Sequence, residues 1–393
     1  MEKQKIYFPN LNGLRSIAAF LVITHHIEQF KSFSSIENYW TTSPFIGIIG
    51  KLGVVLFFVL SGFLITYILL AEENSFKTIS VRKFYIRRMI RILPLYILII
   101  LLAFGILPNI GLFTLPGFGK EVIYSNLFIK LFLYVILFPN LVLSLTGIVP
   151  YASHTWAIGT MEQYYLFLPV ILKYFKKYRI GLMLLIIFFY LFFVKLLSTH
   201  YAAYIPFKIE IAAFWSRFNI DCIAIGGIFA LLLFRKSPAI KFLLNNVLFY
   251  STLVLMIFLI VKGVYIPYIH YEFYSVLFGI IIINFASNDR IGISLENKLT
   301  CYLGDISYGL YMYHPIGIVL AIAVAGAVNV YSNWLIYPLS FVITILLASL
   351  SWRYYESFFL KYKSRFSKVI SGSRVKVNCT AYMKPSGNSS SLT

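Results

Sequence analysis

The sequence predicts an all-α polytopic membrane protein, a bundle of about ten transmembrane helices with one further apolar segment. Hydrophobic residues make up 60% of the 393-residue chain and charged residues only 12%. Apolar stretches of about 18 residues or more recur along the whole length, which is the pattern of membrane-spanning helices. A soluble protein of this size has too little interior to bury so many apolar side chains.

The predicted spans are separated from one another by polar or basic connections. They lie near residues 11–30, 52–70, 92–108, 156–175, 180–198, 212–234, 245–263, 268–287, 302–325 and 333–351. Lys3 and Lys5 precede the first span as in a signal peptide, but no small-residue cleavage pattern follows it. We therefore expect the first span to be retained.

The charge distribution predicts the orientation of the spans. The chain carries 34 basic and 14 acidic residues, a net charge of +20, and the basic residues gather in segments 82–91, 173–179, 235–241 and 361 onward. Lysine and arginine are retained on the cytoplasmic side of membrane proteins. We expect a multi-pass protein of the inner (plasma) membrane with both termini cytoplasmic, and membrane lipids rather than nucleic acid around its basic residues.

One apolar segment, residues 122–147, does not fit this orientation as a span. Counting it would place the basic residues 173–177 outside the cell. Lys130 lies in its middle and Pro139 near its end. Irregular backbone is tolerated at membrane depth where protein or a wet cavity covers it. We expect a re-entrant segment, or one lying along the outer face.

The chain divides into a membrane domain, residues 1–360, and a polar tail, residues 361–393, which we expect to be disordered and cytoplasmic. No internal repeat of the kind common in transporters is visible. Three scattered cysteines and the lack of any zinc or phosphate-loop motif predict neither a metal site nor a cofactor.

Arg15 and His26 stand out within the first predicted span. Eleven steps at about 100° per residue bring them to within roughly 20° of one helix face, about 16 Å apart. His25 is turned about 80° away from Arg15 by the same geometry. Ionisable residues inside a membrane span are costly and usually functional. His26 is therefore the candidate catalytic residue, with an interfacial histidine beside water as the alternative.

Arg87, Arg88 and Arg91 open the third predicted span, at spacings of three and four that let them converge. Guanidinium groups bind phosphate through paired hydrogen bonds. The arginines therefore predict a phosphate site, and an ordinary cytoplasmic anchor is the equal alternative.

The segment TWAIGTMEQYYLFLP places Trp156 and Glu162 at the entry of another predicted span. A carboxylate at membrane depth could orient a histidine or accept a proton, or it could pair structurally with an arginine. Arg217 and Asp221, four residues apart, predict a mutual ion pair within one helix. This second pair is expected to be structural.

Ser307, Tyr311 and His314 follow one another at positions i, i+4 and i+7, so a helix presents them as one polar stripe. Such a stripe faces other helices or a pore. Hydrogen bonding between helices explains the serine and the tyrosine equally well. No G-x-S-x-G motif occurs, so we expect no serine nucleophile.

Together these segments resemble the acyltransferase 3 family, integral-membrane enzymes that O-acetylate bacterial surface polysaccharides. The resemblance runs from about residue 8 to residue 360. The matching segments are NGLRSIAAFLVITHH, FFVLSGFLIT, RRMIRILPLY, TWAIGTMEQYYLFLP, ISYGLYMYHP and RYYESF. Two positions differ from the family pattern: Met161 replaces the first of two glutamates, and Ser357 replaces the proline after Glu356.

The resemblance implies an acyltransferase that moves an acyl group, most often acetyl, from acyl-CoA to a hydroxyl of a cell-surface or lipid-linked carbohydrate. It carries Arg15 and His26 over as an essential pair, Arg88 and Arg91 as the Arg-x-x-Arg motif, and Glu162 as a signature carboxylate. Acyl-CoA is then a co-substrate and the glycan the acceptor.

These expectations combine into a hypothesis of mechanism. His26 and Glu162 act as the catalytic pair, with Glu162 holding the tautomer of the imidazole and Arg15 stabilising the oxyanion or fixing the donor. Arg87, Arg88 and Arg91 bind the donor, while Ser307, Tyr311, His314 and Trp156 support the site. The rival functions are a transporter or flippase, whose substrate path the same charges would line, and a non-catalytic scaffold.

Overall fold

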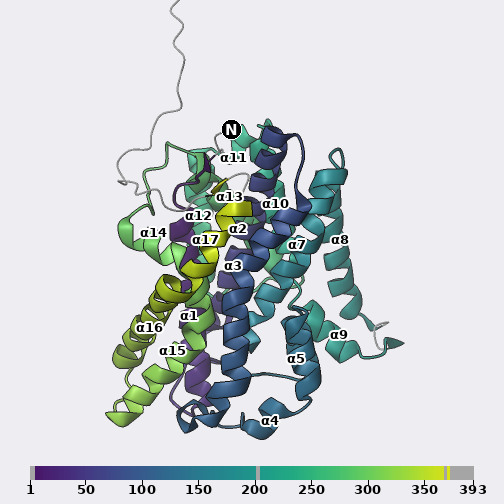
Figure 1. Ribbon diagram of the computed structural model, residues 1–393. Helices are drawn as coiled ribbons and strands as arrows, with labels where there is room; N and C mark the ends of the chain where they lie inside the picture. Colours follow the sequence, from purple (N-terminus) through teal and green to yellow (C-terminus); the bar gives the residue numbers. More distant parts are fainter. Residues whose placement is uncertain (1–4, 201–203, 367–369, 372–393) are drawn as a thin grey trace, which may run out of the picture.

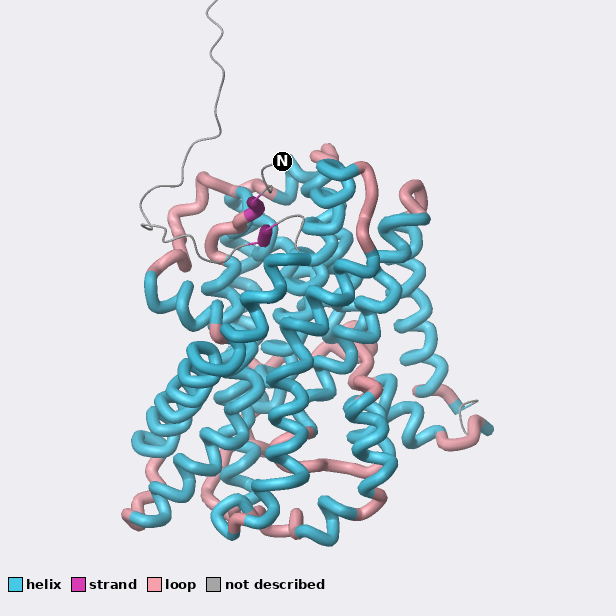
Figure 2. Tube along the Cα trace, viewed as in Figure 1, coloured by secondary structure: helices cyan, strands magenta, loops and turns pink. Residues whose placement is uncertain are grey.

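The structure is a computed structural model that describes residues 5–200, 204–366 and 370–371. Within these residues the predicted all-α fold is confirmed, and the strands are limited to β1 (Lys5–Ile6) and β2 (Ile370–Ser371), which pair in parallel. Figure 2 shows helix along nearly the whole trace, with the two strands side by side near the N-terminus.

Each of the ten predicted spans coincides with a long helix, and short helical segments adjoin α3, α10 and α15. The long helices are α1 (Leu11–Phe33), α2 (Pro44–Phe76), α3 (Val81–Leu101), α7 (Trp156–Tyr174), α8 (Arg179–Leu197), α10 (Ile220–Phe234), α12 (Asn246–Val261), α13 (His270–Ser287), α15 (Ser307–Ala327) and α16 (Asn333–Leu350). The short ones are α4 (Lys120–Tyr124), α5 (Leu127–Val135), α6 (Pro139–Leu145), α9 (Lys208–Trp215), α11 (Ala239–Leu243), α14 (Lys298–Asp305) and α17 (Ser357–Phe366).

Six stretches of described helix are long and apolar enough to cross a membrane: Pro44–Phe76, Val81–Asn109, Arg179–Leu197, Lys208–Phe234, Ser307–Ala327 and Asn333–Lys363. Helix α12 is apolar but shorter. A membrane protein is therefore supported, while the predicted number of about ten spans stays a prediction.

The core of the bundle forms around α1 and α2, which pack against each other and against α15 and α10 respectively (Figure 1). The inward side chains of α1 are small or branched, and Ala18, Ala19 and Val22 are fully buried. Gly62 of α2 lies against the carbonyl of Ile223, and Gly226 of α10 lies against Val59. Small residues at such crossings let two helix backbones approach closely.

Helix boundaries follow local capping chemistry. Ser43 accepts a hydrogen bond from the amide of Ile46, and Pro44 occupies the first turn of α2, where its missing N–H costs nothing. Asn297 and Thr300 form a reciprocal capping box at the start of α14. These caps fix where α2 and α14 begin, and α14 leads directly into α15.

The odd segment 122–147 is broken into parts of α4, α5 and α6, none of which has the length of a span. The ammonium of Lys130 donates to the carbonyls of Val122 and Ile123, at 2.8 and 3.1 Å, and to the hydroxyl of Ser125. The buried ammonium is thus hydrogen-bonded by the preceding residues of the same segment. Helices α4 and α5 lie at the end of the bundle opposite the N-terminus (Figure 1).

Two expectations differ from the structure. Arg217 precedes α10 and donates to the carbonyl of Ala213 at 2.7 Å, and no ion pair within the described part of the chain joins it to Asp221. The predicted pair is wrong because α10 begins at Ile220, so the two residues share no helical face. In addition, residues 361–366, expected in the disordered tail, belong to α17. Of the rest of the tail, β2 is described, while residues 367–369 and 372–393 lie outside the described residues.

A buried ion pair anchors the end of α1. Lys31 donates to Glu28 at 2.9 Å and to Asn333 of α16 at 2.7 Å, and Tyr337 of α16 donates to Glu28 at 2.8 Å. Both charged side chains are essentially inaccessible to solvent. Because each charge is paired and hydrogen-bonded, the network fixes α1 against α16 just beyond His26.

Candidate active site

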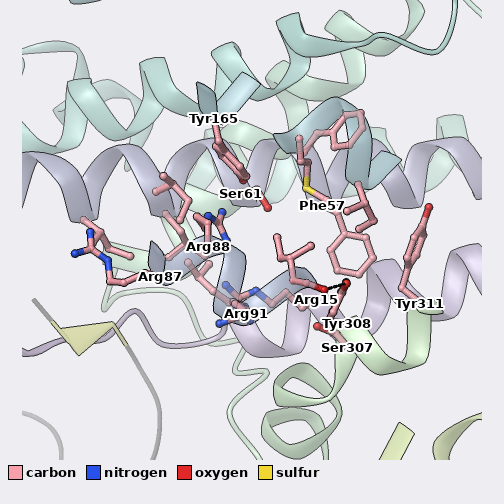
Figure 3. Close-up of a pocket in the computed structure, with 18 of the residues that line it drawn as sticks. Arg15, Phe57, Ser61, Arg87, Arg88, Arg91, Tyr165, Ser307, Tyr308 and Tyr311 are labelled. Atoms are coloured by element: carbon pink, nitrogen blue, oxygen red, sulfur yellow. Dashed lines mark hydrogen bonds between the residues drawn. The ribbon is translucent and has the colours of Figure 1, made fainter. Parts of the chain in front are cut away.

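A cavity of about 200 Å³ lies between α1, α2, α3, α7, α15 and α17 (Figure 3). One buried water needs only about 10–15 Å³ measured in this way, so the cavity has room for a ligand of many atoms. Its walls are largely apolar and aromatic, with Phe57, Phe58 and Tyr165 among them. An apolar pocket with a few converging polar groups is the usual form of a small-molecule site.

One end of the cavity is strongly cationic. Arg15, Arg88, Arg91 and Lys363 all line it, and the three arginines are electrostatic neighbours of Lys363. In Figure 3 the side chains of Arg15, Arg88 and Arg91 gather on one side of the cavity. Like charges held this close together favour a ligand that carries several negative charges.

Arg87 differs from its neighbours, although it borders the cavity. Its Nη2 donates to Glu72 at 3.0 Å in a buried ion pair, and its Nη1 donates to the carbonyl of Phe366 at 3.1 Å. Figure 3 shows its guanidinium directed away from those of Arg88 and Arg91. The three arginines therefore do not converge on one point, since Arg87 is already paired with Glu72 and the carbonyl of Phe366.

Arg88 and Arg15 are positioned by neighbours in the cavity wall. The guanidinium of Arg88 lies 4.2 Å from the ring centroid of Tyr165, and its buried Nε has no hydrogen-bond partner within the described residues. Nη1 of Arg15 donates to Asn12 at 2.9 Å, and Asn12 in turn donates to Asp305 at 3.2 Å. The aromatic ring under Arg88 and the single hydrogen bond of Arg15 hold each guanidinium in place while leaving other N–H groups to donate to a ligand.

The predicted stripe of α15 lies on one buried face, as expected. Ser307 and Tyr311 line the cavity, and the ring of His314 lies 5.8 Å from that of Tyr311. The hydroxyl of Tyr311 donates to the carbonyl of His154 at 2.5 Å. Tyr311 therefore stands between the cavity and the histidines, at the opposite end from the arginines (Figure 3).

Three imidazoles form a row next to Tyr311. The ring of His314 is 4.6 Å from that of His26 and 5.0 Å from that of His154. His154 belongs to a short 3-10 turn, Ser153–Thr155, that precedes α7. Burial lowers the pKa of His154 to about 3, so this imidazole is neutral at pH 7. We call His26, His314 and His154 the histidine row.

The tautomer of His26 is set by the backbone. Its Nδ1 lies 2.8 Å from the carbonyl of Val22. A carbonyl only accepts hydrogen bonds, so Nδ1 carries a proton, and in the neutral imidazole Nε2 then carries the lone pair. The hypothesis that Glu162 fixes this tautomer is therefore not needed, because Val22 already does so.

His25 and His26 face different surroundings, in the way that helical geometry predicts. Nδ1 of His25 lies 2.6 Å from the carbonyl of Ile46 on α2, and its ring packs 4.5 Å from Trp40 and against Gly50. Of the two adjacent histidines, His26 is the one in the histidine row.

Glu162 and Trp156 lie on α7 but do not line the cavity. One carboxylate oxygen of Glu162 is buried without a hydrogen-bond partner in the described part of the chain, and its charged neighbour is Arg88. Glu162 is thus placed near the arginines, rather than beside His26. The ring of Trp156 packs edge-on against Phe58 at 6.1 Å, behind the cavity wall.

Sequence reasoning missed three residues of this region. Lys363 falls in the predicted tail, because polar composition hides the turns of α17 that bring it to the cavity. Tyr165 lies four residues beyond Met161 and so shares its helix face, which is the signal that could have identified it. His154 precedes the predicted span, and nothing in its spacing links it to His26 or His314.

Comparison with known proteins identifies the family of the chain. The family model described as acyltransferase domain matches residues 8–353. A Staphylococcus aureus (strain COL) protein provisionally named an O-acetyltransferase is 26% identical over 91% of this chain and 58% of its own length. O-acetyltransferase OatA of Staphylococcus aureus (strain MRSA252) is 25% identical over 93% of this chain and 61% of its own length.

A third relative is similar over a shorter region. Peptidoglycan O-acetyltransferase OatA of Listeria monocytogenes is 30% identical over 44% of this chain and 25% of its own length. The chain spans about three fifths of the length of the two Staphylococcus relatives. No solved structure matches the chain. The family model covers most of the chain, which therefore belongs to the acyltransferase 3 family.

Proposed function

We propose that the protein transfers an acetyl group from acetyl-CoA to a hydroxyl of a cell-envelope carbohydrate. The observation that carries the proposal is the polarity of the cavity, which has cations at one end and Tyr311 at the other, with the histidine row behind Tyr311. An acyl-CoA has the matching polarity, since its phosphates and its thioester lie at opposite ends of a thin arm.

Arg88, Arg91 and Arg15 are the proposed phosphate ligands, with Lys363 beside them. Arg88 and Arg91 lie three residues apart on α3, so one anionic group reaches both. Arg87 is left out of this set because Glu72 neutralises it. Charge-assisted hydrogen bonds from guanidinium to phosphate are among the strongest that proteins make.

Arg15 acts on the donor rather than on the reacting carbonyl. Helix α1 is continuous from Leu11 to Phe33, so Arg15 and His26 are about 16 Å apart along its axis at 1.5 Å per residue. No single atom of a substrate contacts both side chains over that span. Of the two roles considered for Arg15, the geometry supports fixing the donor.

His26 is the proposed general base, because its Nε2 lone pair is free to accept a proton. It removes the proton of the acceptor hydroxyl while the oxygen attacks the thioester carbonyl carbon. The carbon–sulfur bond then breaks, and the leaving thiolate takes the proton from the imidazolium. A positioned base is typically worth about 10²- to 10⁴-fold in rate. Tyr311 has to turn aside for the thioester to reach His26.

The basic segments support a cytoplasmic entry for the donor. The start of α3, which carries the arginines, and α17, which carries Lys363, lie in the half of the bundle that also carries the N-terminus and α11 (Figure 1). By the distribution of lysine and arginine this end is cytoplasmic. With about ten spans and both termini inside, the histidine row lies deeper toward the outer face, where a lipid-linked or polymeric glycan has access. Peptidoglycan, named for the Listeria relative, is one acceptor to test.

The test is an assay of the purified protein in vesicles with radiolabelled acetyl-CoA and extracted envelope glycan. We expect label to appear as an alkali-labile ester on the glycan. Movement of the glycan across the vesicle without a covalent change would instead favour the transporter alternative. If the assay detects neither an ester nor movement of the glycan, the acyltransferase and the transporter hypotheses are both contradicted.

A further inference from the structure

The histidine row contains more imidazoles than a single general base requires. His26 comes from α1, His314 from α15 and His154 from the turn before α7. The ring centroid of His314 nevertheless lies 4.6 Å from that of His26 and 5.0 Å from that of His154. Three separate parts of the chain thus bring neutral bases to one place. Apolar side chains at these positions would make folding more favourable, since burying polar groups without hydrogen-bond partners costs free energy.

Each of the three imidazoles is hydrogen-bonded to the backbone. The carbonyl of Val22 holds Nδ1 of His26, the carbonyl of Tyr311 holds Nδ1 of His314 at 2.7 Å, and the backbone of Met312 bonds to His154. Each Nδ1 anchored by a carbonyl carries a proton, so the Nε2 of that ring is a bare acceptor. Nε2 of His314 and of His154 are both buried without a partner in the described part of the chain.

Two neighbouring lone pairs do not bond to each other, but a proton on either one changes this. An imidazolium Nε2–H donates to the adjacent Nε2 lone pair as a charge-assisted hydrogen bond. One added proton would therefore allow a hydrogen bond between two neighbouring rings of the histidine row. General base catalysis at His26 supplies that proton.

We propose that His314 and His154 are positioning residues that share, through their free Nε2 atoms, the proton that His26 takes from the acceptor hydroxyl. The inference rests on the proposed function, in which His26 is the general base. It adds that the basicity of His26 is set by the next imidazole in the row, rather than by a carboxylate.

The charges around His26 agree with this assignment. On α1, His25 lies 5.2 Å away and the Glu28–Lys31 pair is internally neutralised, with α16 supplying Asn333 and Tyr337 to that pair. On α2, the residue that packs against His25 is Gly50, which carries no charge. From α15 and the turn before α7 come the other two imidazoles. Within the described residues, the hydrogen bonds of the three imidazoles run to the backbone and not to carboxylates.

The test compares two substitutions of His314. His314→Asn keeps an N–H near the position of Nδ1 for the carbonyl of Tyr311 but removes the acceptor at Nε2. His314→Gln places an amide oxygen near the position of Nε2 and so restores an acceptor. Hydrogen bonds to charged groups correspond to roughly 10- to 100-fold in an equilibrium constant. For His314→Asn we expect kcat to fall by about 10-fold and the acid limb of the pH–rate profile to move about one pH unit lower.

We expect His314→Gln to recover most of both effects. A structural role for His314 would lower the amount of folded enzyme without moving the pH profile. His154→Asn and His154→Gln repeat the comparison one ring further along the row, and they decide the matter if His314→Asn does not fold. His270→Gln is the matched control, because His270 is also buried but begins α13 and accepts a hydrogen bond from the amide of Ile266.

The two hypotheses fail in different ways. If the wild-type protein forms no ester, the proposed function is wrong. If the wild type forms ester, but folded Asn and Gln variants at His314 and His154 share its pH profile, the proposed function stands and the shared-proton role is overturned.

Discussion

The imidazole rings of His26 and His314 lie with their centroids 4.6 Å apart, although one belongs to the first helix of the bundle and the other to α15. Each ring turns a protonated Nδ1 to a backbone carbonyl, at 2.8 and 2.7 Å. The lone pair of His26 is thus left free without help from any other side chain. This relationship makes His26, and not its neighbour His25, the base to test.

His26→Ala is expected to abolish ester formation, because it removes the proposed general base and the ring of His314 lies 4.6 Å from that of His26. His25→Gln is expected to keep most of the activity, since the glutamine amide still offers an N–H to the carbonyl of Ile46. Ester formation is measured with labelled donor at equal amounts of folded protein. Equal loss in both variants would contradict the choice of His26.

The arginines of α3 are expected to separate by function. Arg88→Ala combined with Arg91→Ala should raise the KM for acetyl-CoA by roughly 100-fold or more, because each lost charge-assisted hydrogen bond is worth about 1.5–3 kcal/mol. The KM for the glycan should stay unchanged, as should the thermal unfolding midpoint. Unchanged donor KM in the folded double variant would remove the phosphate-site role.

Arg87→Ala should behave in the opposite way to the double variant. It leaves the buried carboxylate of Glu72 without its partner, and breaking a buried ion pair costs about 3–5 kcal/mol. We expect a lower unfolding midpoint in detergent with little change in donor KM. Arg87→Ala combined with Glu72→Leu, which removes both charges, should recover much of the lost stability. A large rise in donor KM for Arg87→Ala would instead place Arg87 at the ligand.

Local patterns in the sequence predicted the fold well, because helix periodicity and apolar length are properties of short stretches. The stripe of Ser307, Tyr311 and His314 and the separation of His25 from His26 follow from 3.6 residues per turn, and both match the structure. The Arg217–Asp221 pair failed because a spacing of four has meaning only inside one helix, and α10 begins between the two residues.

Contacts between distant segments were beyond the reach of these patterns. Nothing in the spacing of His154 indicates that its ring lies 5.0 Å from His314, since that distance depends on how α7 and α15 cross. Arg87 and Arg88 are equivalent by composition, and only Glu72 on another helix distinguishes them. Tertiary packing therefore decides which of the predicted charges remain available to a ligand.

The Glu28–Lys31 network should be required for stability rather than for chemistry. Glu28→Ala leaves the buried ammonium of Lys31 with only Asn333, so we expect a loss of about 3–5 kcal/mol and a clearly lower unfolding midpoint. Glu37→Ala, which removes a glutamate from the loop after α1, should change the midpoint little. A Glu28→Ala variant that melts like the wild type would show that α1 is held against α16 by apolar packing alone.

The crossing of α2 and α10 gives the last prediction, because it depends on the lack of a side chain at one position. A Cβ added at Gly226 would collide with the backbone of Val59 on α2, whereas one added at Gly47 of α2 would meet nothing within 4 Å. We expect Gly226→Ala to cost about 1–3 kcal/mol through overpacking. Gly47→Ala should be neutral or stabilising, since alanine favours the helical state over glycine. The unfolding midpoints of the two variants in the same detergent decide this, and equal midpoints would mean that α2 and α10 do not pack with their backbones in contact.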